Sequence, residues 1–533
     1  MNEDTTATEH TIGDNNINPF GLDIHNPVFL ISGLTIIAFV LVTLMFQQGS
    51  AEFFAWLRPA ITSTFDWFFI SAGNIFVVFA LVVCVSPLGR VRLGGQTATP
   101  DYSYIGWFSM LFAAGMGIGL MFFGVSEPMS HFASSMGGIS VGDNGMRTDW
   151  APLGAAAGDI EGAKNLAMAA TIYHWGLHPW SMYAVVGLAL AFFSFNHKLP
   201  LTLRSAFYPL LGERVWGWTG HVIDTIAVFA TLFGLATSLG FGTQQALAGF
   251  NFLYGWGTGN VAIVLLITFI TMIAIVSVVR GLDGGVKILS EINMGLALLL
   301  LLFVLFVGPT LEIISTMFAG AAAYATEFIP LSMPFGREDA NFSQGWTSFY
   351  WAWWISWSPF VGMFIARVSR GRTVREFLLC VILVPTLLCV LWMATFGGTA
   401  ISQVIADAAA PVAAASQEIK LFHMLNDFPL SSLLSLIGIV LVLVFFVTSS
   451  DSGSLVIDTI TAGGKTDAPV AQRVFWCSFE GLVAAVLLLV GGAEALGALQ
   501  AMAVSTGLPF TIVLLAMCVS LWMGLSKASK ELA

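Results

Sequence analysis

Long apolar runs separated by short polar breaks dominate the chain from Pro27 to Gly524. Each run has about 20 residues, the length that a helix needs to cross a hydrocarbon core of roughly 30 Å. The runs are continuously apolar and do not alternate as the strands of a membrane barrel do. The pattern predicts an all-α integral membrane protein with 12 transmembrane helices, near residues 28–46, 65–86, 104–125, 166–195, 221–241, 260–279, 291–308, 344–368, 377–397, 431–449, 474–492 and 499–523.

The composition and the charge exclude other classes of protein. Of the 533 residues, 57% are hydrophobic and only 10% are charged, whereas a soluble domain usually carries about 25% charged residues. The net charge is −11 and no basic cluster is present, which excludes nucleic acid as a partner because its phosphates must be neutralised by Lys and Arg. The partners that we expect are therefore membrane lipid and small molecules.

The placement of Lys and Arg predicts the orientation, because these residues concentrate in the cytoplasmic loops of membrane proteins. With both termini cytoplasmic, the 12 spans place fifteen Lys and Arg residues in inner connections and five in outer ones. The first 26 residues contain neither Lys nor Arg, which excludes a cleavable signal peptide. We expect a multi-pass protein of the bacterial inner membrane, with short cytoplasmic tails at 1–27 and 524–533.

The two longest connections, 126–165 and 309–343, both lie on the outer side of the membrane in this arrangement. The first is rich in glycine and acidic residues and is either a partly ordered lid or a solvated loop. Within the second, residues 309–330 have helical periodicity but too little apolarity for a span. This segment predicts an amphipathic helix on the membrane surface.

Three glycines, Gly115, Gly117 and Gly119, lie within five residues in the middle of the third span. Each costs a helix about 1 kcal/mol relative to alanine, which favours a break at mid-membrane depth, where free backbone groups can bind a ligand. The alternative is a helix-packing face, because Gly115 and Gly119 have the spacing of close helix contacts. A nucleotide-binding loop is excluded because no strand precedes the glycines.

The eighth span carries five tryptophans in twelve residues, from Trp346 to Trp357. On a helix many of these rings share one face. The alternative is an interfacial aromatic belt, but a belt places rings at the ends of a span, and this cluster extends more than two turns inward. Pro359 removes a backbone donor, and Ser356 and Ser358 can offer substitute hydrogen bonds, so we expect this helix to be broken at depth as well.

A second aromatic cluster, Trp175, Trp180 and Tyr183, lies in the fourth span on a helix that we expect to bend at Pro179. Rings on two bent or broken spans indicate a cage for a quaternary ammonium or sulfonium group, which ring faces hold at about 0.5–2 kcal/mol per contact. The nearby His174 and His178 have the spacing of metal ligands, but the absence of a third ligand favours buried core histidines.

Hydroxyl side chains, Thr448 and Ser449 among them, follow Phe445 at the end of an apolar run. Hydroxyl and carbonyl oxygens with little net charge suit Na⁺ better than Ca²⁺ or Mg²⁺. The alternative is ordinary hydroxyl-to-backbone bonding, with Asp451 capping the following helix. The remaining acids near spans lack an evident partner and receive no role: Asp66, Glu127, Asp224, Asp283 and Glu480.

Four segments together, 113–128, 174–191, 346–377 and 448–454, resemble the betaine/choline/carnitine transporter family, and the tryptophan-rich third segment is its most specific signature. The resemblance implies a secondary transporter with the fold of LeuT-type sodium symporters, assembled as a homotrimer. It implies two leading helices, two inverted five-helix repeats and a periplasmic connection between the repeats, at 28–103, 104–308, 344–523 and 309–343. The glycine-rich and tryptophan-rich segments then begin the two repeats, where paired breaks indicate a midplane site.

The same resemblance implies the site residues. The substrate's onium group would lie among aromatic rings: Trp175, Trp180, Tyr183, Trp353, Trp354 and Trp357, with Phe349 lining the path. Its carboxylate would meet backbone N–H groups and one hydroxyl, from Gly115, Gly117, Gly119 and Ser238. One Na⁺ site would be formed by Ala113, Met116, Phe445, Thr448 and Ser449. A second Na⁺ site keeps Thr231 and Phe360, but Leu235 occupies its other threonine position, so two Na⁺ per cycle do not follow.

Two differences between this chain and other branches of the family narrow the expected function. Choline-type members carry Asp at the position of Gly119, where a carboxylate balances a cation, whereas a zwitterion brings its own. Na⁺-independent carnitine exchangers differ after the double tryptophan, while this chain keeps residues 356–359 as Ser-Trp-Ser-Pro. We expect a Na⁺-coupled symporter, not an enzyme, for glycine betaine or dimethylsulfoniopropionate, with Na⁺ as coupling ion and no other cofactor. The alternative is a choline or carnitine transporter or exchanger of the same family.

Overall fold

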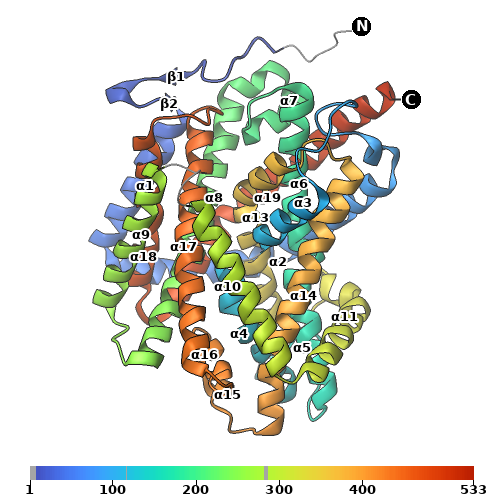
Figure 1. Ribbon diagram of the computed structural model, residues 1–533, viewed down its shortest axis with the longest axis vertical. Helices are drawn as coiled ribbons and strands as arrows, with labels where there is room; N and C mark the ends of the chain where they lie inside the picture. The colour runs from blue at the N-terminus through green and yellow to red at the C-terminus, as the bar shows by residue number, and fades with distance from the viewer. Residues whose placement is uncertain (1–7, 116, 281–285, 533) are drawn as a thin grey trace.

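The computed structural model describes residues 8–115, 117–280 and 286–532, and most of them are helical. Most of the long helices run along the long axis of the molecule, and both termini lie at one end (Figure 1). Ten helical stretches in the described part are long and apolar enough to cross a membrane. They are α1 (Val28–Met45), α2 (Gln47–Val85), the end-to-end pair α5 (Ile160–Trp175) and α6 (Leu177–His197), α8 (Trp218–Tyr254), α9 (Asn260–Arg280), α10 (Val286–Val307), α14 (Val374–Ala406), α17 (Ser431–Thr461), α18 (Val470–Gly491) and α19 (Ala495–Glu531).

An eleventh candidate span consists of two shorter helices, α3 (Tyr104–Gly115) and α4 (Ile118–Gly137), which meet at an angle of 63°. The tryptophan-rich helix α13 (Ser348–Val368) is not among these spans because its indoles and serines make it less apolar. The predicted class, an all-α membrane protein, is confirmed. The count of 12 spans, the inverted repeats and the segment boundaries derived from them stay predictions.

The predicted break in the tryptophan-rich span is wrong, because α13 is a continuous helix through Pro359. A proline frees the carbonyl of the residue four positions earlier, here Ile355. The hydroxyl of Ser358 donates a hydrogen bond to that carbonyl oxygen at 2.7 Å. Since the freed acceptor has a partner, the helix continues without exposing an unpaired polar group.

The predicted bend at Pro179 occurs three residues earlier, at Gly176, which separates α5 from α6. A Cβ at Gly176 would lie 2.6 Å from the carbonyl oxygen of Ile172, so only glycine fits this close approach. Pro179 lies in the first turn of α6, where its missing N–H costs no hydrogen bond. The bend therefore places the two halves of this aromatic cluster on different helices.

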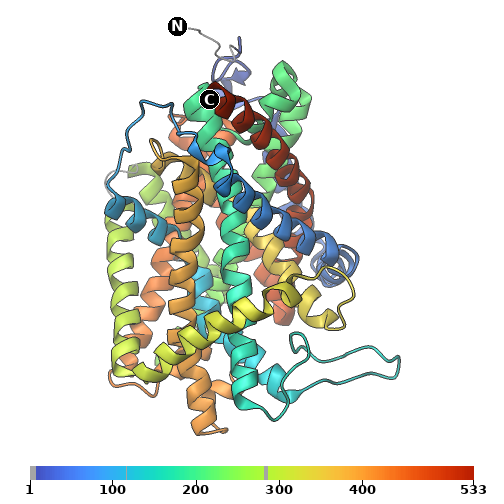
Figure 2. The same cartoon turned by 90° about the vertical axis from the view of Figure 1, so that its right-hand side faces the viewer.

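Helix α11 (Thr310–Ser332) confirms that the segment after α10 is helical. In Figure 2 it runs obliquely across the upright helices, and its position on a membrane surface stays a prediction. The remaining short helices lie in the connections: η2 (Pro87–Arg90), η3 (Leu203–Phe207), α7 (Tyr208–Leu211), η4 (Gly212–Trp216), α12 (Ala340–Phe342), the π-helical turn η5 (Ser343–Thr347), α15 (Pro411–Ala414), α16 (Lys420–Leu425) and η6 (Gly492–Glu494).

The glycine-rich connection is shorter than predicted, because α4 extends to Gly137 and only 138–159 lie between α4 and α5. Arg147 stabilises this loop: its guanidinium donates hydrogen bonds to Asp149 and to the carbonyl oxygen of Ala151. The hydrogen bonds from Arg147 to the Asp149 carboxylate lower the pKa of Asp149 to about 2. The backbone N–H of Leu153 donates to Asp339 at 2.7 Å, so the loop is attached to the chain that precedes α13.

The described part of the N-terminal segment is attached to the helices and is not a free tail. Strands β1 (Asn16–Ile17) and β2 (Ile24–His25) form a small antiparallel pair around η1 (Pro19–Gly21). The side chain of Asp23 bonds to Lys465, and the amide of Asn16 donates to the carbonyl oxygen of Ala462 at 2.9 Å. The segment therefore covers the connection between α17 and α18.

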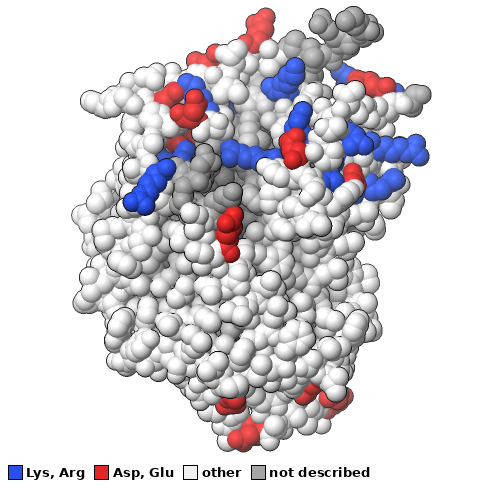
Figure 3. Space-filling view, in the orientation of Figure 1, with Lys and Arg blue, Asp and Glu red and all other residues white. Residues whose placement is uncertain are grey.

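Charged side chains divide the surface into two ends. On the face drawn in Figure 3, Lys and Arg gather at the end that carries the termini, whereas only acidic side chains are visible at the opposite end. The broad band between them is almost free of charge on this face. Such a distribution is typical of a membrane protein whose basic end faces the cytoplasm.

Candidate functional site

The glycine run breaks the third predicted span, as expected. Helix α3 ends at Gly115 and α4 begins at Ile118, with Gly117 in an extended conformation between them. Met116, a predicted Na⁺ ligand, lies outside the described residues. A Cβ at Gly119 would lie 2.8 Å from the Trp175 ring and 3.0 Å from the Trp353 ring. Glycine at this position therefore lets two indoles approach the α4 backbone.

The predicted aromatic residues come together in one cavity. Its walls come from the break between α3 and α4, the start of α6 with the end of α5, and the middle of α13. All six predicted rings and the three glycines line it, together with Ser238 of α8: Trp175, Trp180, Tyr183, Trp353, Trp354, Trp357, Gly115, Gly117 and Gly119. We call this space the aromatic cavity.

Two ring pairs of the aromatic cavity contact each other at nearly right angles. The ring centroids of Trp175 and Trp354 are 4.9 Å apart, and those of Tyr183 and Trp354 are 5.7 Å apart. Phe349 does not line the cavity. It stacks on Trp353 at 5.5 Å with an interplanar angle of 15°, so in this structure it supports a wall ring from behind.

The indole N–H groups of this cavity are largely used within the protein. Trp357 and Trp353 both donate to the carbonyl oxygen of Gly234, at 2.9 and 3.4 Å, and Trp354 donates to that of His174 at 2.9 Å. These rings therefore present π-faces and edges, not donors, to a ligand. The buried hydroxyl of Tyr183, by contrast, has no partner among the described residues and is free to donate to an anionic group.

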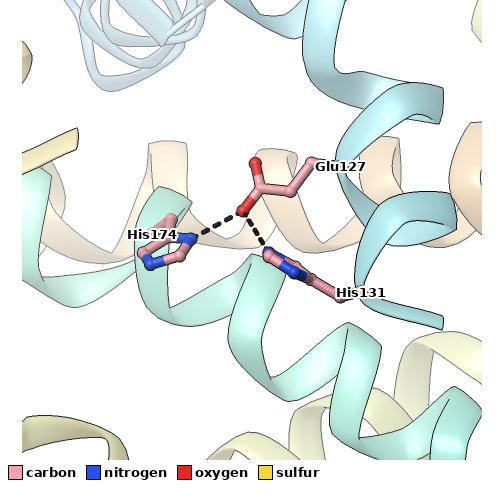
Figure 4. Close-up of side chains that lie close together, drawn as sticks. All are labelled: Glu127, His131 and His174. Carbon is pink, nitrogen blue, oxygen red and sulfur yellow. Dashed lines mark hydrogen bonds and ion pairs between the residues drawn. The ribbon is translucent and has the colours of Figure 1, made fainter. Parts of the chain in front are cut away.

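Glu127, a buried carboxylate to which the sequence pattern assigns no role, holds Trp175 of the aromatic cavity in position. Oε2 of Glu127 accepts hydrogen bonds from the indole N–H of Trp175, at 2.7 Å, and from the Tyr350 hydroxyl. Oε1 accepts from His174 Nδ1 at 2.7 Å and from His131 Nε2 at 3.3 Å, as Figure 4 shows. These four donors satisfy the buried carboxylate, whose charge would be costly in the interior without hydrogen bonds.

Glu127, His131 and His174 each offer one ligand atom, all within 4.8 Å of one another, and this set could hold a metal ion. In the structure the same atoms bond to each other, and Nε2 of His174 lies 2.9 Å from the Thr347 hydroxyl. The arrangement is that of a hydrogen-bond network behind the aromatic cavity. His178 bonds Asn74 at 3.0 Å and stacks on Trp351, so it does not join His174 in a metal site.

The described residues of the first predicted Na⁺ site line a second, larger cavity. These residues are Ala113, Phe445, Thr448 and Ser449. Helix α17 is continuous from Ser431 to Thr461, so the capping role predicted for Asp451 is wrong. The other part of that alternative is observed, because the Thr448 hydroxyl donates to the carbonyl oxygen of Val444 at 3.0 Å. Asp451 instead accepts a hydrogen bond from Ser277 of α9 at 2.6 Å. We call this space the hydroxyl cavity.

Of the two residues kept from the predicted second Na⁺ site, one lines a cavity. Phe360 lines the hydroxyl cavity and packs on Trp357 with ring centroids 5.3 Å apart. Thr231 is buried in α8, donates to the carbonyl oxygen of Ala227 at 2.7 Å, and lines neither cavity. The second Na⁺ site stays a prediction.

The two cavities are adjacent, because four residues line both of them: Ala114, Gly117, Trp357 and Val361. Trp357 contributes the only ring to this shared set. A ligand in the aromatic cavity is therefore separated from the hydroxyl cavity by the α3–α4 break and by one indole.

Comparisons with known proteins agree with this geometry. The family model described as betaine/carnitine/choline family transporter matches residues 27–530. The chain is 64% identical to the glycine betaine/proline/choline transporter of Vibrio parahaemolyticus, over 97% of this chain and 94% of that protein. It is 54% identical to glycine betaine transporter 1 of the same organism, over 97% of both chains, and 40% identical to the glycine betaine transporter of Acinetobacter baylyi, over 94% of this chain and 73% of that protein.

The match covers both cavities and nearly all of the described helices, and the resemblance that the four sequence segments indicate is confirmed. Members of this family are transporters, so the prediction that the protein is not an enzyme agrees with the match. The chain belongs to the betaine/carnitine/choline family of transporters.

Proposed function

We propose that this protein is a Na⁺-coupled symporter for glycine betaine or a similar zwitterionic onium solute. One observation carries the proposal: six aromatic rings from α5, α6 and α13 line a single cavity beside an interrupted helix. A methylated onium group cannot donate a conventional hydrogen bond and is bound by ring faces. Since these indoles already donate to protein acceptors, the cavity suits that chemistry.

The absence of charge around the aromatic cavity favours a zwitterion over a cation. No charged residue occurs among its described lining residues, and Gly119 leaves no room for an acidic side chain against Trp175. A purely cationic ligand would leave its charge unbalanced, which is costly inside a membrane protein. A zwitterion brings its own carboxylate, which can meet the Tyr183 hydroxyl and the backbone N–H groups near the break.

The names of the relatives agree with this substrate. Glycine betaine occurs in the name of each of the three relatives compared above, and the name of the 64% identical protein also includes proline and choline. Choline has no carboxylate, so we rank it below glycine betaine for this chain. Dimethylsulfoniopropionate shares the onium and carboxylate groups and is a further candidate.

Na⁺ coupling is supported by the oxygen-rich wall of the hydroxyl cavity. Thr448 and Ser449 lie on α17 opposite the end of α3, where Ala113 can offer a carbonyl oxygen. Neutral oxygen ligands suit a monovalent cation. A membrane potential of 100 mV contributes about 2.3 kcal/mol per charge moved, so one Na⁺ with a neutral solute gives more than tenfold accumulation before any Na⁺ gradient is added.

We further propose alternating access around these cavities, with the interrupted α3–α4 pair as the moving backbone. The basic end of the molecule, which carries both termini, would face the cytoplasm of a bacterial inner membrane. Assembly as a homotrimer in the lipid bilayer remains a proposal based on the family resemblance.

The test is uptake of radiolabelled glycine betaine into proteoliposomes that contain the purified protein. We expect saturable uptake that requires an inward Na⁺ gradient and is absent when K⁺ replaces Na⁺. The variant Thr448→Ala/Ser449→Ala should require a higher Na⁺ concentration for half-maximal uptake, and Ser431→Ala, at the far end of α17, is its control. Uptake independent of Na⁺ would contradict the coupling, and transport that does not saturate would indicate a channel.

A further inference from the structure

The hydroxyl cavity contains a cation whose role the proposed function does not explain. Arg367, near the end of α13, is the only charged residue among the described residues that line it. Its guanidinium forms no hydrogen bond or ion pair with the part of the chain that the structure describes, and its Nη2 is buried. Among the described residues, the charged group that acts on it is Arg473, another cation. An unpaired guanidinium within a membrane protein is costly unless an anion joins it.

A second polar side chain without a partner lines the same cavity. Asn293 of α10 is 1% exposed, and neither its amide nitrogen nor its amide oxygen has a hydrogen-bond partner among the described residues. Buried side-chain amides are nearly always hydrogen-bonded, because an unpaired one costs about 1–3 kcal/mol. A ligand in this cavity can satisfy both groups, since Asn293 and Arg367 both offer N–H donors.

The wall between the aromatic cavity and Arg367 is a stripe of rings on one side of α13. Trp357, Phe360, Phe364 and Arg367 follow one another at intervals of three, four and three residues, and all of them line the hydroxyl cavity. This spacing keeps side chains on one helix face. An onium group that leaves the aromatic cavity would therefore pass over ring faces before its carboxylate reaches the guanidinium.

We infer that Arg367 and Asn293 form a second, carboxylate-binding subsite for the transported zwitterion, in the hydroxyl cavity. The inference rests on the proposed function, because it assigns the anionic half of the solute to this end of the cavity. Ten residues separate Trp357 from Arg367 on α13, which corresponds to about 15 Å along a helix. A betaine is too short to span that distance, so the subsite holds the solute after it leaves the aromatic cavity.

The position of the subsite predicts an effect on one side of the membrane only. Arg367 lies five residues before Arg372, in the last turn of α13 and toward the basic end of the molecule. On the face drawn in Figure 3, the surface is hollowed among basic side chains in that half of the molecule. The subsite therefore acts on solute that is released to, or taken up from, the side that faces the cytoplasm.

The experiment compares uptake of radiolabelled glycine betaine into inside-out and right-side-out membrane vesicles. In inside-out vesicles, Arg367→Gln and Asn293→Leu should each raise the half-saturating betaine concentration about tenfold, the expected effect of losing a hydrogen bond to a charged group. In right-side-out vesicles the change should stay below twofold, because the aromatic cavity is intact. Acetate at the inner face should compete with betaine in the wild type and not in Arg367→Gln.

Arg370→Gln is the matched control, because it removes one positive charge three residues away, where Arg370 is exposed and pairs with Asp101. Its half-saturating concentration should equal that of the wild type on both sides. Arg367→Lys keeps the charge and covers the case in which Arg367→Gln does not fold, as judged by size-exclusion chromatography. It should lose affinity at the inner face less than Arg367→Gln does.

Wild-type vesicles that take up no betaine would overturn the proposed function itself. Wild-type transport with unchanged inner-face affinity in both Arg367→Gln and Asn293→Leu would overturn the subsite alone. A loss of acetate sensitivity without a change in betaine affinity would also overturn it, because the site would then bind a free anion and not the solute.

Discussion

The two helical segments that line the aromatic cavity from α3–α4 and from α13 each carry a helix-breaking sequence, yet only one of them breaks. The chain leaves the helical conformation between Gly115 and Ile118, whereas α13 stays helical through Pro359. The glycines have no side chains that could replace a lost backbone contact. Ser358, next to the proline, bonds the carbonyl that the proline frees. A helix-breaking residue therefore predicts a break only where the freed polar group lacks a substitute partner.

This difference gives the cavity one adaptable wall and one rigid wall. Free backbone groups beside the glycines can change partners as a ligand binds, while α13 holds its tryptophans in fixed positions. Glu127 joins the two walls, because it lies on α4 and accepts a hydrogen bond from Tyr350 on α13. Four variants test whether the walls have these separate roles, in order of decreasing expected effect.

Removing the joining carboxylate should have the largest effect. Glu127→Leu leaves the buried donors of Trp175, His174 and Tyr350 without their acceptor, and the loss of a buried charged partner costs about 3–5 kcal/mol. We expect betaine uptake to be abolished and the melting temperature to fall, measured by uptake and by thermal unfolding in detergent. Glu127→Gln keeps the shape and one acceptor oxygen and should retain part of both properties.

Glu161→Gln removes an exposed carboxylate at the start of α5 and is the control for Glu127. It should behave like the wild type. If Glu127→Leu transports normally, the network behind Trp175 does not hold the cavity in shape.

Filling the space at Gly119 should have the next largest effect. The added methyl group of Gly119→Ala would lie 2.8 Å from the Trp175 ring and 3.0 Å from the Trp353 ring, and overpacking of this kind costs about 1–3 kcal/mol. We expect the apparent affinity for betaine to fall roughly 10- to 100-fold in uptake assays. Gly106→Ala, on α3, is the control, since its new methyl group meets only the Ser103 hydroxyl at 3.4 Å. Equal affinity in both variants would show that the rings do not depend on glycine here.

Removing one ring should have a smaller effect, confined to binding. Trp357→Leu removes one ring face, and a desolvated cation–π contact is worth about 0.5–2 kcal/mol. The betaine concentration for half-maximal uptake should rise about 2- to 30-fold, with a maximal rate closer to that of the wild type. Trp357→Phe should restore most of the affinity, and Trp56→Leu, at an exposed site on α2, should change nothing. An unchanged half-saturating concentration would mean that the ring only packs.

The smallest effect should come from the residue that keeps α13 continuous. Ser358→Ala leaves the carbonyl of Ile355 unpaired, and a hydrogen bond of this kind contributes about 0.5–1.5 kcal/mol. We expect a lower melting temperature with modest loss of uptake. The double variant Ser358→Ala/Pro359→Ala restores the backbone N–H and should recover stability, which a double-mutant cycle measures. Additive losses in that cycle would show that the hydroxyl does not compensate for the proline.

The sequence predicts which residues line the aromatic cavity better than it predicts the hydrogen bonds that hold these residues in place. Apolar length and glycine content predict the membrane helices and the α3–α4 break, because both depend on neighbouring residues. The family resemblance names the six rings that line the aromatic cavity. The break expected at Pro359 is wrong because the Ser358 hydroxyl satisfies the carbonyl oxygen of Ile355 that the proline frees, so the helix need not open there.

Glu127 is missed for a different reason. Two of its donors, Trp175 and Tyr350, are 48 and 223 residues away in the chain, so no local pattern links them to it. The one signal near it is His131, four residues later on the same helix face. The docking of the N-terminal segment cannot be predicted from a local pattern either, since Asp23 bonds Lys465 across 442 residues.

A single indole, Trp357, belongs to the walls of both cavities. If this ring both binds the solute and closes the passage between the two cavities, then binding and release depend on the same side chain. A solute that binds Trp357 more tightly would also keep this passage closed and would be released more slowly. Among a series of onium compounds, the tightest binders should therefore be poor cargo, and the best cargo should bind with only intermediate strength.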